Sequence, residues 1–433
     1  MSRTVTIRSV KGVRDLLPAE TGLWQKIEDE SRRVFSAYNF REIRTPVLEQ
    51  TELFARSVGS DTDIVLKEMY TFEDRDRESL TLRPEATAGV VRAAIEHGML
   101  NEGGLHKLYY LGPMFRRERP QKGRYRQFYQ IGAEVLGSDH PLVEVEALEM
   151  LMLFLARLNL QDVALLVNSV GDARCRSDYV KLLRRELEPV QAQMCVDCHR
   201  RAETNPLRVF DCKVEADQPI IARLPNILDH LCPECLQHFE YVTAELARRE
   251  IPYTITPRLV RGLDYYTRTT FEITSGKLGA QNALLGGGRY DGLSEILGGP
   301  PAPGFGFAIG EDRLALVIEE SAALAGNVRL AAFVAWIGEQ ARGPAHDLAR
   351  ALRREGMRTE TGLEAVKLKK MLGQANRLQA RFAVILGEGE LATGRYQVKD
   401  METGEQREIE SRRIPEYLKD RLAPSGAQMK ETS

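Results

Sequence analysis

The sequence predicts an α+β fold with an antiparallel sheet core, a helical insertion and a separate C-terminal α/β domain. Three observations support this prediction. Strand-like segments in the first 165 residues follow one another through polar turns, without the regular alternation of strand and helix that marks a parallel sheet. Residues 166–254 change to short helical pieces, and strand-like segments resume after them. Residues 328–424 then alternate strand, helix and strand.

Residues 1–165 are expected to form the first part of the core. Apolar residues recur at helical spacing from 23 to 38, which predicts an amphipathic helix. The extended segment RTPVLEQ follows, and its Pro46 suits the edge of a sheet. The remaining elements are expected in this order: SLTLRPE as a strand, ATAGVVRAAIEHG as a helix, LHKLYYLGPMFRRE and YRQFYQIGAEVLG as strands, and 142–158 as an apolar helix.

Residues 255–325 are expected to complete the core. In PRLVRGLDYYTRTTFEIT, the side chains of Thr269, Phe271 and Ile273 share one face by period two. The glycine-rich GGGRYDG is expected as a loop, and GFGFAIG leads into the apolar helix GEDRLALVIEE. The linker SAALAGN precedes the C-terminal domain, and residues 425–433 are expected to be a disordered tail.

Charge is distributed unevenly along the chain. The 433 residues carry 60 Lys and Arg against 62 Asp and Glu, so the total charge is −2. Residues 328–433 hold 19 basic and 15 acidic residues, a net charge of +4, and the rest of the chain holds 41 and 47, a net charge of −6. A basic C-terminal domain favours an anionic partner. The clusters KLKK and LRRE are candidates for phosphate contacts or, alternatively, solvated helix faces.

Several classes of protein are excluded by missing patterns. The sequence has no G-x-x-x-x-G-K-[ST] motif, and the glycine spacing in GFGFAIG does not fit a dinucleotide-binding fingerprint. The N-terminus lacks the apolar run of a signal peptide, and no segment is long and apolar enough to span a membrane, so we expect a cytoplasmic protein. Phosphate binding would then depend on arginines such as Arg116 and Arg313, unless these form ordinary ion pairs.

Six motifs in order give the chain a family resemblance. RTPVLEQTELFARSVG, GPMFRRERPQKGRYRQFYQIGAEVLG and GFGFAIGEDRLAL resemble motifs 1, 2 and 3 of the class II aminoacyl-tRNA synthetases. LVRGLDYYTRT and GGGRYDG resemble the two histidine-specific signatures of the histidyl-tRNA synthetase family, and KGVRDLLP resembles its N-terminal signature. The resemblance implies a class II catalytic core in two parts and a C-terminal anticodon-binding domain.

The resemblance also implies a reaction, the ATP-dependent attachment of L-histidine to its tRNA. The histidine carboxylate attacks the α-phosphorus of ATP, pyrophosphate leaves, and tRNA then takes the acyl group from histidyl-adenylate. Arg116 matches the arginine that holds the α-phosphate, Arg313 the one that holds the γ-phosphate, and Arg261 the catalytic arginine. Mg²⁺ is expected to accompany the ATP phosphates.

Recognition of histidine is assigned by the same resemblance. Glu85, Thr87 and Gln130 match positions near the α-amino group, and Glu134 and Tyr266 match positions that hold the imidazole. Tyr265 is expected to flank the pocket, although one of the two tyrosines is expected to serve partly in packing, because adjacent strand residues face opposite sides. The alternative for Glu134 is a solvent-facing strand carboxylate. The glycine loop is expected to approach the substrate, with these residues in it: Gly287, Gly288 and Tyr290.

The cysteines leave two interpretations open. Cys195 and Cys198 form one C-x-x-C pair and Cys232 and Cys235 another, with Cys212 between the pairs. Together the pairs could hold a structural zinc ion. However, the 33 residues between them exceed the usual spacing of a zinc ribbon, and the resemblance gives zinc no support. The alternative is that these are buried, reduced cysteines.

The expected partners are histidine tRNA, L-histidine, ATP and a second copy of the chain, because motif 1 forms a dimer interface in this family. Two other functions are weighed against the enzyme. One is a catalytically silent, histidine-sensing regulatory paralogue of ATP phosphoribosyltransferase, which lacks the anticodon-binding domain. The other is the synthetase-like sensor domain of a kinase, which does not fit a chain with no kinase segment.

Overall fold

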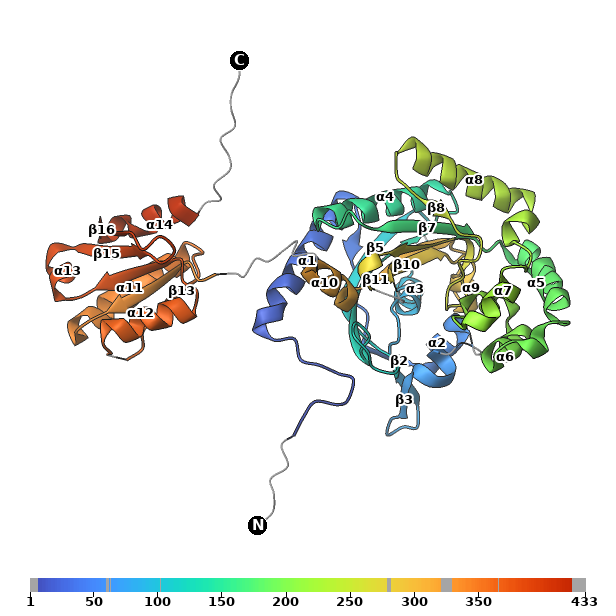
Figure 1. The fold of residues 1–433 in the computed structure, drawn as a ribbon, viewed down its shortest axis with the longest axis horizontal. Helices are drawn as coiled ribbons and strands as arrows, with labels where there is room; N and C mark the ends of the chain where they lie inside the picture. The colour runs from blue at the N-terminus through green and yellow to red at the C-terminus, as the bar shows by residue number, and fades with distance from the viewer. Residues whose placement is uncertain are drawn as a thin grey trace, which may run out of the picture. The chain divides into compact units, whose positions relative to one another are not determined.

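The computed structural model describes residues 7–59, 62, 64–101, 103–278, 282–320, 329–364 and 366–422. The chain forms two compact units, Met1–Gly326 and Asn327–Ser433, and Figure 1 draws each of them. The predicted linker, SAALAGN, and the predicted tail, 425–433, lie outside the described residues.

The first unit is organised around an eight-stranded sheet with the order β1-β5-β6-β11-β10-β9-β7-β8. Only the outer pairs β1/β5 and β7/β8 are parallel, so the prediction of an antiparallel core is confirmed. The strands of this sheet are β1 (Arg41–Glu42), β5 (His106–Phe115), β6 (Gln127–Leu136), β7 (Ala164–Ser169), β8 (Thr254–Ile255), β9 (Thr267–Thr274), β10 (Ala283–Arg289) and β11 (Gly304–Gly310).

Four helices cover one face of this sheet and form the main core with it (Figure 1): α1 (Pro18–Ala37), α4 (Leu142–Arg157), α8 (Pro233–Arg248) and α10 (Glu311–Glu320). Phe35 of α1 is fully buried, and its ring packs against Tyr109, Phe154 and Phe307. Successive residues of a strand point to opposite faces, so Tyr110 faces the other side and packs near Val90 of α3. The opposite face of the sheet is therefore left for the cavity described below.

A smaller three-stranded sheet, in the order β2-β4-β3, accompanies short helices next to that cavity. Its strands are β2 (Leu48–Gln50), β3 (Tyr70–Glu73) and β4 (Ser79–Leu82). The helical elements here are α2 (Thr51–Val58), η1 (Ile64–Glu68), α3 (Thr87–Glu96) and α9 (Leu293–Ile296). The carboxylate of Glu85 accepts hydrogen bonds from the backbone N–H groups of Thr87 and Ala88, which stabilises the start of α3.

The insertion is helical, as predicted, but its predicted boundaries of 166 and 254 cut through the sheet. Residues 166–169 belong to β7, which pairs with β9, and Thr254 belongs to β8. The strand ALLVNS is too short to be distinguished by periodicity from a buried helical turn, which explains the misplaced boundary. The insertion's elements are α5 (Ala173–Leu187), η2 (Gln191–Gln193), α6 (Val196–Thr204), η3 (Pro206–Asp211), η4 (Glu215–Asp217), α7 (Gln218–Ile221) and η5 (Ile227–His230), followed by α8.

The second unit is the predicted α/β domain. Its sheet has the order β13-β12-β14-β15-β16, in which β12 is parallel to β13 and β14, and the other pairs are antiparallel. Trp336 of β12 is buried, and its indole N–H donates to the carbonyl of Gly362 over 2.7 Å. The strands are β12 (Ala332–Trp336), β13 (Thr359–Thr361), β14 (Phe382–Leu386), β15 (Arg395–Asp400) and β16 (Gln406–Glu410). The helices are α11 (Glu339–Arg354), α12 (Leu368–Arg377), α13 (Glu388–Thr393), η7 (Ser411–Arg413) and α14 (Ile414–Leu422).

Candidate active site

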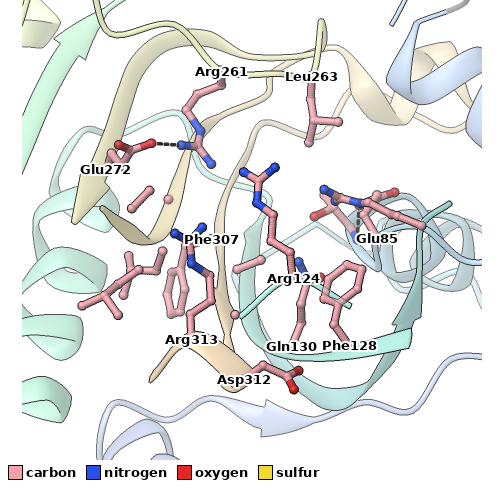
Figure 2. A pocket seen from close by; sticks show the side chains of 18 of the residues that line it. Glu85, Arg124, Phe128, Gln130, Arg261, Leu263, Glu272, Phe307, Asp312 and Arg313 are labelled. Carbon is pink, nitrogen blue, oxygen red and sulfur yellow. Dashed lines mark hydrogen bonds and ion pairs between the residues drawn. The ribbon is translucent and has the colours of Figure 1, made fainter. Parts of the chain in front are cut away.

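A cavity of about 280 Å³ lies in the first unit and collects most of the predicted site residues. Figure 2 shows the guanidinium groups of Arg124, Arg261 and Arg313 converging on it. Residues far apart in the sequence reach it from β5, β6, β9, β10, β11 and the segments that follow them. Nine of the predicted residues line it: Glu85, Thr87, Arg116, Gln130, Arg261, Tyr265, Tyr266, Gly286 and Arg313.

Arg116 directly follows β5 and is held in place by two contacts. Its Nε donates to the carbonyl oxygen of Pro84 over 2.9 Å, and its guanidinium lies 5.3 Å from the centre of the Phe128 ring. A guanidinium fixed by one nitrogen and by an aromatic face keeps its other N–H groups for a ligand. The geometry is therefore not that of an ordinary surface ion pair.

Arg313 lies in the first turn of α10 and shares the cavity with Arg124. Burial, together with the positive charge of Arg124, lowers the pKa of Arg313 from its ordinary value. Arg124 itself pairs with Glu118, with 3.1 Å between Nη1 and Oε2. An anion in the cavity would relieve the repulsion between Arg124 and Arg313.

Arg261 precedes β9 in the chain and lies over the sheet. Its Nη1 is 2.5 Å from Oε2 of Glu272 on β9, and its Nε is buried with no partner among the described residues. A Cβ atom at Gly286 would lie 2.5–2.6 Å from three atoms of this guanidinium. Only glycine at 286 therefore leaves room for Arg261 in this position.

The opposite part of the cavity is polar and nearly closed. Gln130 on β6 is buried, and its Oε1 has no hydrogen-bond partner in the described part of the chain. A buried acceptor without a donor is costly, so this oxygen marks a place for an N–H group of a ligand. Glu85 lies nearby with both oxygens turned to the start of α3.

Glu134 lies beneath the cavity and does not line it. Its side chain is fully buried, which excludes the solvent-facing alternative. One carboxylate oxygen accepts from the Thr87 hydroxyl over 2.7 Å, and the other accepts from the Tyr290 hydroxyl over 2.5 Å. Burial raises the pKa of Glu134 from 4.5 to about 8, although these two hydrogen bonds act in the opposite direction.

Three tyrosines pack together around this floor. The rings of Tyr265 and Tyr266 lie 4.8 Å apart between centroids, and those of Tyr265 and Tyr290 lie 5.7 Å apart. Tyr265 and Tyr266 both line the cavity and both belong to a buried apolar cluster. The expectation that one of the pair would serve in packing is therefore too restrictive, because both tyrosines combine the two positions.

The expected glycine loop is a strand. Gly287 and Gly288 lie in β10, in the middle of the sheet, and neither lines the cavity. A Cβ at Gly287 would lie 2.1 Å from the carbonyl oxygen of Gly306, and one at Gly288 would lie 2.5 Å from that of Thr269. These glycines thus permit close strand packing, and Tyr290 supports Glu134 from below.

Residues that the sequence did not single out complete the site. Glu272, Glu118 and Arg124 line the cavity beside the predicted arginines. Glu272 alternates with Phe271 and Ile273 on β9, so period two could have placed it on the opposite face from the core. Arg124 lies in the polar turn, where no periodic signal distinguishes one arginine from its neighbours.

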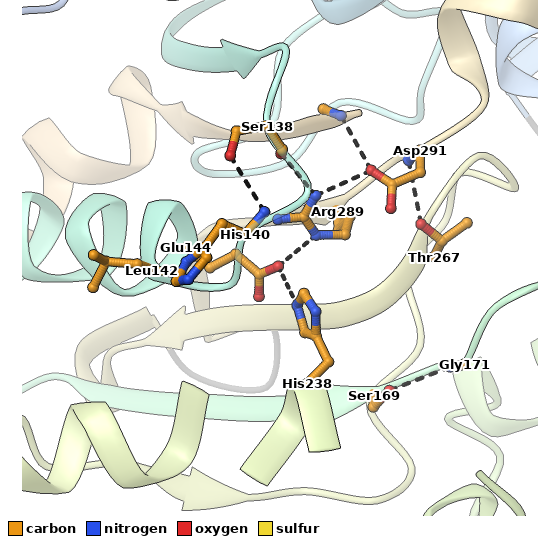
Figure 3. A network of polar contacts seen from close by, with 11 residues as sticks. Ser138, His140, Leu142, Glu144, Ser169, Gly171, His238, Thr267, Arg289 and Asp291 are labelled. Atoms are coloured by element: carbon orange, nitrogen blue, oxygen red, sulfur yellow. Dashed lines mark hydrogen bonds and ion pairs between the residues drawn. The ribbon is translucent and has the colours of Figure 1, made fainter. Parts of the chain in front are cut away.

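A buried polar network behind the cavity was also missed (Figure 3). Arg289 of β10 and Glu144 of α4 are fully buried and form an ion pair. His238 of α8 approaches the same carboxylate, with 2.6 Å between its Nε2 and Oε1 of Glu144. Arg289 also donates to Asp291 over 3.1 Å. The network joins the last helix of the insertion to the sheet.

The two C-x-x-C pairs do not come together, so a single zinc site made from Cys195, Cys198, Cys232 and Cys235 is wrong. Cys195 and Cys198 lie with Cys212 and Asp217, whereas Cys232 and Cys235 lie with Cys175 and Asp172. Each pair begins a different helix, α6 or α8, and these helix starts lie in separate parts of the insertion.

Comparison with known proteins places these features in a family. The sequence profile of the histidyl-tRNA synthetases matches residues 12–314, which contain every residue of the cavity. The chain belongs to the histidyl-tRNA synthetase family. An anticodon-binding domain profile matches residues 331–421, which form the second unit.

Relatives of nearly the same length support the family assignment. The chain is 56% identical to the histidine–tRNA ligase of Solibacter usitatus over 93% of this chain and 96% of that protein. It is 54% identical to the histidine–tRNA ligase of Koribacter versatilis over 95% and 96% of the two chains. The structure of a histidyl-tRNA synthetase from S. aureus, solved without ligands, is 39% identical, with a TM-score of 0.81 over 96% of this chain and all of that one.

Proposed function

We propose that this chain attaches L-histidine to its tRNA at the cavity described above, through a histidyl-adenylate intermediate. The observation that carries the proposal is the convergence of Arg116, Arg261 and Arg313 on one cavity of a histidyl-tRNA synthetase family member. Phosphoryl transfer of this kind needs positioned cations more than a protein nucleophile. In the described residues, the same cavity has an unpartnered amide oxygen at its other end, which suits an amino acid.

The first step joins histidine to ATP. A carboxylate oxygen of histidine bonds to the α-phosphorus of ATP, the bond from that phosphorus to the bridging oxygen breaks, and pyrophosphate leaves. Arg116 and Arg261 neutralise charge at the α-phosphate and orient the attacking carboxylate, while Arg313 holds the γ-phosphate. Arg261 is fixed by Glu272 before substrate arrives, so little reorganisation accompanies the reaction.

Magnesium fits this end of the cavity. Glu118 and Glu272 supply carboxylate oxygens beside the arginines, and Mg²⁺ prefers such ligands. When bound with ATP, the ion would add charge neutralisation at the phosphates. The arginines and these two glutamates would then share the binding of the ATP phosphates.

Histidine occupies the closed end in this proposal. Oε1 of Gln130 accepts from the α-ammonium group, with Glu85 and Thr87 beside it. The imidazole lies against Tyr265 and Tyr266 and reaches Glu134, which releases the Thr87 hydroxyl to do so. An apolar amino acid would leave these buried polar groups without partners and would therefore be rejected.

The second step transfers the histidyl group to the 3′-terminal adenosine of histidine tRNA, and AMP leaves. The positive charge of the C-terminal domain supports a tRNA partner for that unit. Motif 1 supports a homodimer, and the substrate tRNA supports a cytoplasmic location. Among the described residues, no helix is long and apolar enough to cross a membrane.

A charging assay tests this function. Purified full-length protein is incubated with labelled histidine, ATP, Mg²⁺ and a histidine tRNA transcript, and acid-precipitable label is counted. We expect label that depends on ATP and on the tRNA. A protein that binds histidine but transfers none of it would instead be the regulatory paralogue. The fold alone does not separate these two functions, because a Bacillus halodurans protein described as an ATP phosphoribosyltransferase regulatory subunit/histidyl-tRNA synthetase has a TM-score of 0.65 at 21% identity.

A further inference from the structure

All six cysteines of the chain lie in two compact clusters within the insertion. The first, cluster A, contains Asp172, Cys175, Cys232 and Cys235. The second, cluster B, contains Cys195, Cys198, Cys212 and Asp217. Each cluster offers three thiols and one carboxylate, and within each all four candidate ligand atoms lie within 4.8 Å of one another.

Cluster A is built from two helix starts with the same local geometry. Asp172 caps α5 and Cys175 lies in its first turn, while Cys232 precedes α8 and Cys235 lies in the first turn of α8. The backbone N–H of Asp172 points to the sulfur of Cys175 over 3.3 Å. Helix starts and backbone N–H groups both stabilise negative sulfur, so two such pairs facing each other make a thiolate site.

Cluster B combines one helix start with the chain that follows it. Cys195 caps α6, and Cys198 lies in the first turn of α6. Cys212 ends η3 and Asp217 ends η4. Cys198, Cys212 and Asp217 are buried, so these thiols and this carboxylate face one another and not solvent.

The distances in the clusters match the edges of a zinc tetrahedron. A Zn–S bond of about 2.3 Å places two sulfurs of a tetrahedral site about 3.8 Å apart. The sulfurs of Cys195 and Cys212 are 3.8 Å apart, and the sulfur of Cys212 is 3.3 Å from Oδ2 of Asp217. In cluster A, the sulfur of Cys175 is 3.5 Å from Oδ1 of Asp172. The cysteines are free, and 3.8 Å is nearly twice the length of a disulfide bond.

We propose that the insertion binds two zinc ions, one in each cluster, through three cysteine sulfurs and one aspartate oxygen. Each ion takes the place of the thiol protons: three S–H groups lose their protons, and four bonds to zinc form.

The electrostatics of the clusters agree with this exchange. Burial raises the pKa of Cys198 and of Cys235 above the ordinary thiol value. Without a cation these thiols keep their protons at neutral pH, so zinc binding releases protons and strengthens as pH rises.

The two sites would fix the insertion against the cavity. Site A joins the point where the chain enters the insertion to the start of its last helix, across 56 intervening residues. Site B holds α6 to η3, and between them Asn205 donates to Asp264 over 3.0 Å. Asp264 immediately precedes Tyr265 and Tyr266. On the proposed function, loss of site B therefore raises the KM for histidine more than that for ATP.

Metal analysis of the purified full-length protein tests the proposal. Protein expressed with zinc is freed of loosely bound metal on a desalting column, and its zinc is measured by mass spectrometry. We expect about two zinc ions per chain, about one in Cys175→Ser, about one in Cys212→Ser, and an unchanged content in the control Asp197→Asn, which alters an exposed carboxylate beside cluster B. Zinc-free wild-type protein, or equal zinc in wild type and both serine variants, would overturn it.

A second measurement covers the case in which a serine variant does not fold. Wild-type protein is titrated with an organomercurial, and zinc release is followed with a coloured chelator. We expect all zinc to be released as the six thiols react, and cobalt exchanged into the protein to show the visible spectrum of tetrahedral thiolate coordination. Disulfide formation in both clusters under non-reducing conditions, with no metal bound, would contradict the proposal whatever the activity of the protein.

Discussion

At the scale of single residues, the site depends on a few buried charges whose neighbours hold them in place. Arg261 is paired with Glu272, Arg116 rests on Phe128, and Glu134 takes hydrogen bonds from Thr87 and Tyr290. Each charged group has a defined position before any substrate is bound, as electrostatic catalysis requires.

Replacement of Arg261 tests its assigned role. We expect Arg261→His to slow adenylate formation by about 10²- to 10³-fold, because a fixed charge at the α-phosphate is lost. Binding of histidine should change little, since Arg261 lies at the arginine end of the cavity. Single-turnover adenylate formation and calorimetric histidine binding measure the two effects.

The matched control for this variant is Arg185→His, which alters an exposed arginine of α5. Wild-type adenylate formation in Arg261→His would remove Arg261 from the catalytic machinery. An equal loss of histidine binding and of rate would instead assign it to amino-acid binding.

The buried carboxyl of Glu134 makes stability depend on pH. Its folded-state pKa of about 8 lies above the unfolded value of 4.5, so between these values the unfolded chain loses a proton that the folded chain keeps. Stability therefore falls as pH rises through this window, on the order of 3 kcal/mol between pH 4.5 and pH 7 from this group. Glu134→Gln should show a shallower fall.

Urea unfolding of both proteins at pH 5, 6, 7 and 8 measures this difference. Because other groups titrate equally in the two proteins, only the gap between the curves counts. Parallel curves would mean that Glu134 is ionised in the folded protein.

At the scale of elements, the glycines of β10 decide what the strand can accommodate. A side chain at Gly286 meets only the flexible end of Arg261 at close range, whereas one at Gly287 meets the backbone of Gly306. The two neighbouring glycines therefore have different consequences, although both lie in one strand.

We expect Gly286→Ala to leave the melting temperature nearly unchanged but to reduce adenylate formation on the order of tenfold to a hundredfold, by displacing Arg261. Gly287→Ala is the matched comparison and should lower the melting temperature, because strand backbones must separate. Thermal unfolding and the exchange rate, measured on both variants, separate the two effects. Full activity in Gly286→Ala would contradict the close approach of Arg261.

The elements also show what the sequence could and could not predict. Helices such as α1 and α3 and the paired strands β5 and β6 were predicted from periodicity, because one face of each is apolar. The strand β10 was missed because its glycines carry no periodic signal, and they are there to admit Arg261 and the neighbouring strands. The cysteine clusters were misassigned because folding, not spacing, decides which helix starts face each other.

At the scale of the whole molecule, two units divide the work. The catalytic cavity lies in Met1–Gly326, and the unit Asn327–Ser433 matches an anticodon-binding domain. The second unit carries the excess of basic residues, and Lys369 and Lys370 of α12 are exposed. Charges at such positions can contact tRNA phosphates without affecting the chemistry at ATP.

Double replacement of Lys369 and Lys370 by alanine should raise the KM for tRNA several-fold and make it less dependent on salt. Pyrophosphate exchange, which needs no tRNA, should stay at the wild-type rate. Lys26→Ala, on an exposed face of α1, serves as the control. An unchanged KM for tRNA in the double variant would show that these lysines form only a solvated face.

Histidine-dependent exchange of labelled pyrophosphate into ATP tests the central claim most directly, because it isolates adenylate formation in the cavity. We predict exchange that requires both histidine and Mg²⁺ and that other amino acids do not support. Folded protein that binds histidine but gives no exchange would contradict the account.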